Sequence, residues 1–247
     1  MKLSLLKKFW VFLVLLGTNQ LLIAQFTVTG TVIESSGEPL IGVSILEKGK
    51  PSASTNSISK KMSTSAASVT DMVKRLAKKK LAIHESHKGV KLTKEGNRAA
   101  TMLIRKHRLW EVFLVDKLDF LWDEVHEMAE ELEHIQSKEM IDRLDNFLGN
   151  PKFDPHGDPI PDADGKFATR QQTPLNEFKI GEKGTVVGVR ESSTPFLQYL
   201  DQLGLGLGSK IEILEKYEYD NSAKILLNQS KEIVITGKVC LNLFLQK

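Results

Sequence analysis

The sequence predicts a mainly α-helical chain with small β parts, and three observations carry this prediction. Apolar residues recur at helical spacing through residues 66–79, and histidine and glutamate do so through residues 107–134. Short apolar runs separated by turn residues follow in residues 174–247, which is typical of a small β domain. Since the 247 residues are 41% hydrophobic and 26% charged, the composition excludes wholesale disorder and allows two to three small domains.

Charge divides the chain into a basic and an acidic part. Residues 60–108 hold 14 lysines and arginines against three acids, whereas residues 111–164 hold 16 acids against four bases. A basic module favours a polyanionic partner such as nucleic acid, and an acidic module favours cations. The single cysteine, Cys240, excludes an internal disulfide and a CxxC zinc site, and it fits a reduced compartment.

Residues 1–25 have the pattern of a secretory signal peptide. Three lysines flank the start of the apolar run Phe9–Leu16, and a second apolar run ends at Ala24. The polar residues Thr18–Gln20 interrupt the apolar stretch, which argues against a transmembrane helix. An ordinary buried helix is the alternative.

Residues 26–50 form a fragment with β character. Phe26–Val32 alternates apolar residues with threonine, as a half-buried strand does, and Ile41–Leu46 is expected to form a second strand after a turn. Val28–Gly49 resembles the opening of the small β-sandwich that follows the signal peptide in many TonB-dependent outer-membrane receptors. Two strands cannot complete that sandwich, because a lone hairpin is marginal in water.

Residues 51–104 are predicted to form a winged helix-turn-helix. Helices are expected over Thr55–Met62 and Ala66–Lys79, with the turn Ser63–Ser65 between them. Leu81–Leu92 has the pattern of a β-hairpin wing. Two helices across a tight turn, the second of them basic and rich in small residues at its start, are typical of a DNA-binding unit.

Small residues at the start of the second helix permit close approach to the major groove, and lysines on the helix and wing can meet phosphates. The alternative is a basic, solvated helix pair without a nucleic-acid role. The predicted DNA-contacting residues are Ser65, Ala67, Ser68, Thr70, Asp71, Lys74, Arg75, Lys78, Lys88 and Lys91.

Residues 105–150 carry ligand-type residues at helical spacing. His107 and Glu111 lie one helical turn apart, and four further residues fall within about a third of a helix circumference. Imidazole and carboxylate without sulfur favour harder divalent ions such as Mn(II) or Fe(II). The alternative is a solvated acidic helix face. The four residues predicted to share one helix face are His126, Glu130, Glu133 and His134.

Five segments of residues 55–247 occur in the order found in the diphtheria-toxin-repressor family, which includes iron-dependent repressors and manganese transport regulators. These segments are SVTDMVKRL, GVKLTKEG, RKHRLWE, HEMAEELEHI and HGDPIPD. The resemblance covers nearly four-fifths of the chain. It implies one metal site that uses the residues Glu130, Glu133 and His134, and a second group made of His107, Glu111 and His126.

Two details of this resemblance concern the first metal site. The iron branch often has cysteine at the position of Glu130, so the chain resembles the manganese branch there, in which the residue matching His107 also joins the cluster. The family has a helix before the helix-turn-helix that supports it and supplies further ligands. Here the receptor-like fragment takes the place of that helix, so the first site is expected to be incomplete.

The last part of the chain begins with residues 151–173, which are rich in proline, glycine and aspartate and are expected to be a linker or an ordered loop. Residues 174–247 resemble the SH3-like domain that ends many iron-dependent repressors and occurs in ferrous-iron transport accessory proteins. In some repressors this domain lends a glutamate to the second metal site, and Glu191 lies near that position without matching it. The expected strands are Gly181–Arg190, Ile211–Leu214, Ala223–Leu227 and Ile233–Ile235, with a helix over Thr194–Leu203.

The sequence therefore predicts a homodimeric, metal-dependent repressor that uses Mn(II) or Fe(II) and binds a palindromic double-stranded DNA operator. No nucleophile–base motif or phosphate loop stands out, so neither an enzyme nor a small-molecule substrate is expected. The alternatives are an envelope protein directed by the N-terminal signal, and an iron-transport accessory module without DNA binding. A repressor is expected in the cytoplasm, which conflicts with the signal-like segment and indicates a fused or rearranged reading frame.

Overall fold

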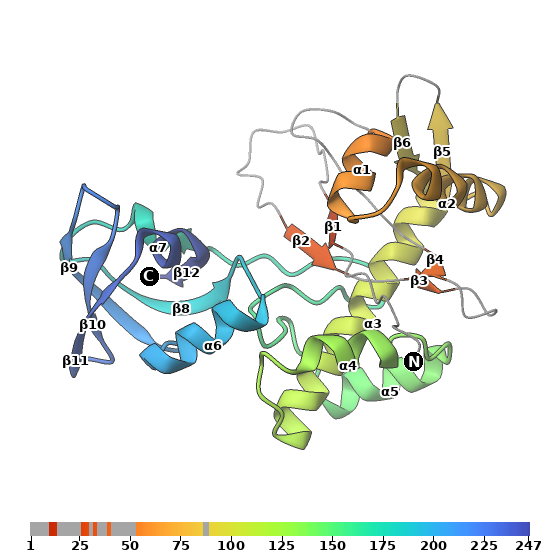
Figure 1. Ribbon diagram of the computed structural model, residues 1–247. Coiled ribbons are helices and arrows are strands. Elements are labelled where there is room, and N and C mark those ends of the chain that lie inside the picture. The colour runs from red at the N-terminus through yellow and green to blue at the C-terminus, as the bar shows by residue number, and fades with distance from the viewer. Residues whose placement is uncertain (1–9, 14–25, 30–31, 34–38, 41–52, 86–88) are drawn as a thin grey trace, which may run out of the picture. The chain divides into compact units, whose positions relative to one another are not determined.

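The computed structural model describes residues 10–13, 26–29, 32–33, 39–40, 53–85 and 89–247 (Figure 1). The chain divides into two compact units. The first unit contains residues up to His107 together with Glu130–Lys138 and Pro161–Lys166, and the second contains the remainder. Within the described residues, no helix combines the length and the apolar character that a membrane span requires.

The described N-terminal residues form two short strand pairs. Strand β1 (Trp10–Leu13) pairs antiparallel with β2 (Phe26–Thr29), and β3 (Val32–Ile33) pairs antiparallel with β4 (Pro39–Leu40). The strand predicted at the start of residues 26–50 is therefore confirmed in part. The second predicted strand, over residues 41–46, lies outside the described residues, as does the segment directly before residue 53.

The helix-turn-helix is formed by α1 (Thr55–Lys61) and α2 (Ala66–Lys78), as predicted. Serine begins each helix, because the side chains of Ser54 and Ser65 accept hydrogen bonds from backbone N–H groups in the first turn. The apolar faces of the two helices meet in one core. Its fully or nearly fully buried members on these helices and the turn are Ile58, Met62, Val69, Val73 and Leu76.

The wing is the antiparallel hairpin of β5 (Ala82–Glu85) and β6 (Gly89–Leu92), again as predicted. A bridge between Ala53 and Val90 ties the hairpin to the residues before α1. Helix α3 (Lys94–Leu118) begins directly after the wing, and Gly96 permits this close approach. A Cβ atom at Gly96 would lie 1.9 Å from the carbonyl oxygen of Leu81, so the position accepts only glycine without a shift of backbone.

Three helices form the middle of the chain: α3, α4 (Val125–Leu132) and α5 (Lys138–Phe147). Leu109, Trp110 and Leu114 of α3 are buried, whereas Leu118 at its end is 51% exposed. The segment after α5 is ordered rather than a free linker. Its first turn is held by the Asp154 carboxylate, which accepts hydrogen bonds from the backbone N–H groups of two later residues at 2.9 Å.

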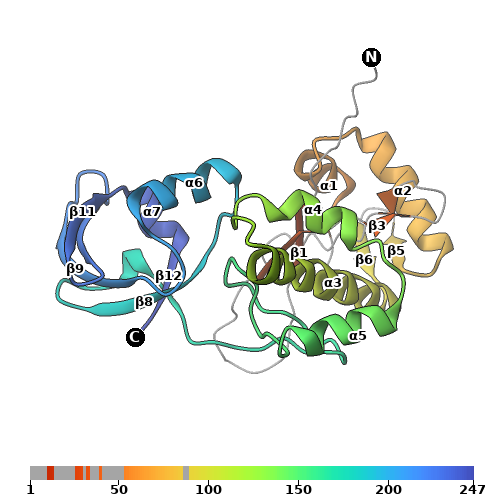
Figure 2. The same cartoon turned by 90° about the horizontal axis from the view of Figure 1, so that it is seen from below.

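The C-terminal domain of the second unit is one curved, fully antiparallel sheet with α6 along one side (Figure 2). The strand order is β11-β10-β9-β8-β12-β7. The predicted helix and strands are confirmed, and the core includes the fully buried Leu200, Ile213, Ile225 and Ile235. The elements are β7 (Thr173–Pro174), η1 (Leu175–Glu177), β8 (Lys183–Val189), α6 (Thr194–Leu203), β9 (Lys210–Lys216), β10 (Ala223–Leu227), β11 (Lys231–Ile235), α7 (Gly237–Asn242) and β12 (Leu243–Gln246).

Candidate metal centre and nucleic-acid interface

Helix α3 carries several buried polar side chains, among them His107, Arg108 and Glu111. His107, Arg108 and Glu111 are each only 3% exposed. Buried ionisable groups cost free energy unless other groups compensate them, so each of these residues is expected to have a dedicated partner. His107 and Glu111 stand one turn apart on the helix, and their ion-pair partners differ.

In the second unit, Glu111 lies between two imidazoles. One carboxylate oxygen is 3.4 Å from Nδ1 of His126 on α4, and the other is 3.8 Å from Nδ1 of His156 in the loop after α5. Ligand-type atoms of Glu111, Asp154 and His156 all lie within 4.8 Å of one another. These three buried residues are called the Glu111 cluster below. Nitrogen and carboxylate donors at this spacing suit a divalent transition metal.

Arg108 fixes the loop that carries two members of the Glu111 cluster. Its Nε lies 3.2 Å from Asp154, and a terminal nitrogen donates to Asp158 at 2.9 Å. The same guanidinium donates to the carbonyl oxygen of Pro159. The backbone N–H of Val189 on β8 donates to the carbonyl of His156 at 2.9 Å, which ties the loop to the C-terminal domain. The loop is thus held from both sides by charge-assisted and backbone hydrogen bonds.

Burial and charge shift the protonation of the Glu111 cluster. Burial by itself disfavours the charged form of His156, but the adjacent Glu111 carboxylate outweighs it and raises the pKa of His156 to about 9. Burial, with the neighbouring Asp158 carboxylate, raises the pKa of Asp154 to about 7. A divalent cation would therefore have to displace protons from the cluster near neutral pH.

In the first unit, His107 pairs with Glu133. Its Nδ1 lies 2.8 Å from a carboxylate oxygen of Glu133, whose side chain is fully buried. Lys106 donates to the carbonyl oxygen of Glu133 at 3.3 Å. Burial, with a contribution from Lys106, lowers the pKa of His134 although Glu133 and Glu130 oppose the shift, so this imidazole is neutral at pH 7 and can act as a ligand.

The prediction that one helix carries four ligand-type residues on one face is wrong. Helix α4 ends at Leu132, so it carries only His126 and Glu130, while Glu133 and His134 lie in the following turn. Helical spacing alone could not show this, because the buried bond from Glu133 to His107 is a tertiary contact. That bond also joins residues that the sequence assigned to different groups.

Asp154 and His156 were not assigned as ligands from the sequence, although the family-like segment HGDPIPD begins with His156. Their segment was predicted as a linker or ordered loop because it is rich in proline, glycine and aspartate. A spacing of two residues in a loop gives no periodic signal. The available signal was compositional, since a histidine and three aspartates are concentrated within residues 154–162.

Six of the ten residues predicted to contact DNA are exposed at the N-cap of α2 or on α2. Ser65, Ala67 and Ser68 at the start of α2 are exposed, and the Ser65 side chain caps the helix. Asp71 and Lys74 are exposed and form an ion pair at 3.5 Å. Lys78 is exposed, while Thr70, Arg75 and Lys91 are half-buried; Lys88 lies outside the described residues. The described residues thus place small, exposed side chains at the start of α2 and cationic side chains further along α2 and on β6.

Two features of the C-terminal domain lie apart from the Glu111 cluster. Glu191 accepts a hydrogen bond from Ser193 at 2.8 Å and pairs with Lys238 at 3.4 Å, so it is engaged within its own domain.

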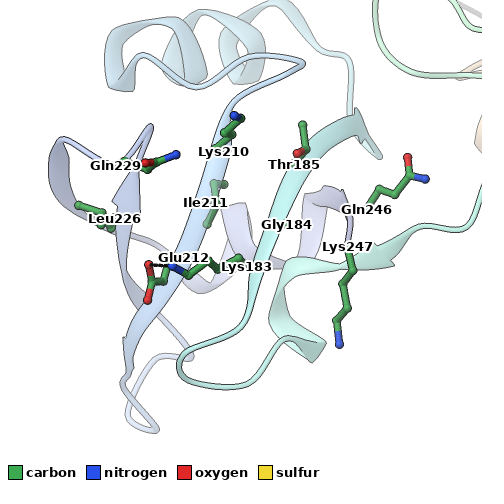
Figure 3. A pocket seen from close by; sticks show the side chains of 10 residues that line it. All are labelled: Lys183, Gly184, Thr185, Lys210, Ile211, Glu212, Leu226, Gln229, Gln246 and Lys247. Carbon is green, nitrogen blue, oxygen red and sulfur yellow. Dashed lines mark ion pairs between the residues drawn. The ribbon is translucent and has the colours of Figure 1, made fainter.

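A hollow of about 340 Å³ over β8 and β9 is lined by lysines, including Lys183 and Lys210, and by no histidine (Figure 3). Its chemistry does not match that of a transition-metal site.

Three parts of the chain match known domain families. Residues 44–90 match the iron dependent repressor N-terminal DNA binding domain, and residues 93–162 match the iron dependent repressor metal binding and dimerisation domain. Residues 173–246 match the FeoA domain. None of these domain matches includes residues 28–43, so the resemblance of that fragment to outer-membrane receptors is unsupported.

Individual proteins and solved structures also match parts of the chain. The chain is 44% identical over 86 residues to a probable metal transport system membrane protein of Chlamydia trachomatis, and 36% identical over 104 residues to an iron-dependent repressor of Mycobacterium tuberculosis. These matches cover 35% and 42% of this chain, which spans 19% and 45% of the two relatives' lengths. A solved structure, described as a manganese-dependent transcriptional repressor in complex with manganese, is 32% identical with a TM-score of 0.70, over 78% of this chain and 90% of that chain.

Proposed function

The chain belongs to the iron-dependent repressor family, and on this premise we propose that it is a homodimeric, metal-dependent repressor that binds the operators of metal-uptake genes. Members of this family are DNA-binding regulators rather than enzymes. The observation that carries the proposal is the buried Glu111 cluster, in a chain whose α2 has an exposed, serine-capped start. The first feature suits a cation and the second suits a DNA groove.

The proposed metal ligands fall into two groups. Glu111, His126, Asp154 and His156 of the second unit supply nitrogen and oxygen donors, supported by the distances around Glu111. His107, one turn before Glu111 on α3, belongs with them by helix spacing. Glu130, Glu133 and His134 remain proposed ligands of the other site. A donor set without sulfur favours Mn(II) or Fe(II).

The chain's own residues suggest how binding and repression are connected. A bound divalent cation would replace the proton that His156 of the Glu111 cluster holds at neutral pH. Glu111 belongs to α3 and His156 to the loop after α5, so ligation would hold these two segments together. In this proposal, cation binding stabilises the form of the protein that binds DNA, and DNA binding in turn strengthens cation binding. The size of this mutual effect is a coupling free energy.

The proposed DNA contact uses α2. Its small N-terminal residues enter the major groove, and Lys74, Arg75, Lys78 and Lys91 meet backbone phosphates. The remaining proposed contacts are Ser65, Ala67, Ser68, Thr70 and Asp71, which lie at the N-cap of α2 or on it, and Lys88. A homodimer would present two copies of α2 and therefore select a palindromic operator.

Selection from random duplex DNA, followed by fluorescence anisotropy with and without Mn(II), tests the proposal. Binding should require metal and weaken steeply with salt. Lys78→Ala should lower the slope of log affinity against log salt by about 1, whereas Lys60→Ala on α1, outside the predicted contact set, should leave it unchanged. Folded protein that selects no DNA at any Mn(II) or Fe(II) concentration would refute the repressor function.

A second candidate rests on the FeoA match over residues 173–246. In that case the chain is an iron-transport accessory module without DNA binding. The same selection separates the two functions, because an accessory module binds metal but recovers no DNA sequence.

A further inference from the structure

Trp122 lies between the Glu111 cluster and the C-terminal domain, in the turn that precedes α4. Its side chain packs against the core of the C-terminal domain. Its indole Nε1 lies 3.0 Å from both carboxylate oxygens of Asp201 on α6. The ring also stacks on the imidazole of His156, with centroids 6.2 Å apart and planes inclined by 16°. One residue thus contacts both the cluster and α6.

The backbone of Trp122 determines which nitrogen of His156 is available. Nε2 of His156 lies 2.7 Å from the carbonyl oxygen of Trp122. A carbonyl oxygen only accepts, so Nε2 carries the hydrogen and the neutral ring exposes its lone pair at Nδ1. That Nδ1 is the atom facing Glu111, at 3.8 Å. A group that hydrogen-bonds to the other ring nitrogen of a metal-binding histidine orients the ring and raises metal affinity.

A second pair of contacts holds the same turn to α6. Gln198 donates to the carboxylate of Asp123 at 2.9 Å, and the hydroxyl of Thr194 donates to the carbonyl oxygen of Asp123 at 3.3 Å. Asp123 is buried and directly follows Trp122. The position of the Trp122 carbonyl therefore depends on α6 through the indole and through the next residue.

We propose that Trp122 is a positioning residue that couples cation binding at the Glu111 cluster to attachment of the C-terminal domain through Asp201. The proposal rests on the metal site proposed above. Attachment of α6 keeps the turn in place, the turn orients His156, and His156 presents Nδ1 to the cation. Because coupling is reciprocal, a bound cation also strengthens the attachment of α6.

Purely structural packing is the competing explanation of the same contacts, since a half-buried tryptophan at a domain boundary is common. The two explanations differ in what they predict for metal binding. Loss of packing alone lowers the stability of the fold without selecting one metal site. Loss of positioning lowers cation affinity at the Glu111 cluster while the fold and any other site stay intact.

Calorimetric titration of the full chain with Mn(II) tests the coupling in matched variants. Asp201→Ala removes the acceptor at an exposed position, and Trp122→Phe keeps an aromatic ring but removes the indole N–H. Each should weaken Mn(II) binding at the Glu111 cluster about tenfold, the lower end of the effect of outer-shell partners. Asp201→Asn retains an acceptor oxygen and should recover most of the affinity. Gln202→Ala, the next exposed residue on α6, is the control and should bind as the unmodified chain does.

Hydrogen exchange supplies the reciprocal readout. Mn(II) should slow amide exchange in α6 of the unmodified chain and do so much less in Asp201→Ala. Glu111→Gln separates this proposal from the one on which it rests. If Glu111→Gln binds Mn(II) with unchanged stoichiometry, the metal site itself is wrong.

If Glu111→Gln loses one equivalent of Mn(II) while Asp201→Ala and Trp122→Phe bind normally, the site stands and the coupling is wrong. An equal loss at every Mn(II) site in these two variants would also overturn the coupling, because general destabilisation would then explain it.

Discussion

The candidate metal centre of the second unit and the DNA-facing helix of the first unit place their polar groups in opposite surroundings. Glu111, Asp154 and His156 are buried and bound to other protein groups. Ser65, Ser68 and Lys78 on α2 are exposed above an apolar core. A cation site gains from low dielectric and fixed ligands, whereas a DNA contact must stay open to a large, hydrated partner. The burial of the side chains therefore distinguishes a cation site from a DNA contact better than the types of residue do.

The largest expected effect is on stability, in the buried region. Arg108→Ala leaves Asp154 and Asp158 without their shared cation, and an uncompensated buried charge costs about 3–5 kcal/mol. Urea unfolding of the metal-free chain measures this loss. Arg143→Ala, which breaks an exposed pair with Glu139 on α5, is the control and should cost under about 1 kcal/mol. Equal costs for the two variants would mean that the buried network is not what holds the loop.

The second prediction concerns metal content. Glu111→Gln preserves shape but removes the charge shared by His126 and His156, so we expect loss of one equivalent of Mn(II) and of the metal dependence of DNA binding. Elemental analysis of the purified chain and anisotropy measure the two outcomes. Glu131→Gln, an exposed change on α4, should alter neither. If Glu111→Gln kept its full metal content, the buried Glu111 cluster would not be the metal site, and the contrast between the two regions would fail.

The third prediction is a pH dependence of Mn(II) affinity at the Glu111 cluster. The pKa of His156 is raised to about 9, so binding must displace a proton at neutral pH, and affinity should rise about tenfold per pH unit between pH 7 and 8. The rise should be steeper below pH 7, where Asp154 also holds a proton. Burial lowers the pKa of His134, so a site using it should gain little from deprotonation of its imidazole over that range. Isothermal titration at three pH values checks this, and a flat profile at the cluster contradicts it.

The same shift affects the metal-free chain. A pKa raised in the folded state gives stability that is complete below the ordinary value of 6.5 and is lost as the pH rises through about 9. Urea unfolding should therefore show the metal-free chain losing this contribution over that window. His156→Asn should lose that part of the pH dependence.

The smallest expected effect lies in the exposed region. Ser65→Ala removes the side-chain cap of α2 and should cost about 1 kcal/mol of unfolding free energy. Thermal unfolding measures this cost, and Ser65→Asp, which keeps a capping oxygen, should restore stability. Restored stability with weakened DNA binding would show that the negative charge, rather than the cap, acts at the DNA face.

The helices and strands with periodic patterns could be predicted from the sequence because their signals are local. The serine caps, the apolar stripe of α2 and the strand runs such as Ala223–Leu227 follow from nearest-neighbour preferences and alternation. Helix α7 and strand β12 were not predicted, because residues 239–245 are apolar except for Asn242 and suit either element. Domain boundaries and DNA contacts remain predictions.

The sequence by itself determined the fold class, the family and the supply of ligand-type residues on α3 and α4. Only the tertiary structure decided how those residues combine. It ended α4 at Leu132, joined His107 to Glu133, and brought Asp154 and His156 from a proline-rich loop to Glu111. The physical reason is that caps and periodicity act over one or two turns. The partner of a buried charge is instead chosen by desolvation, which draws on groups far apart in the chain.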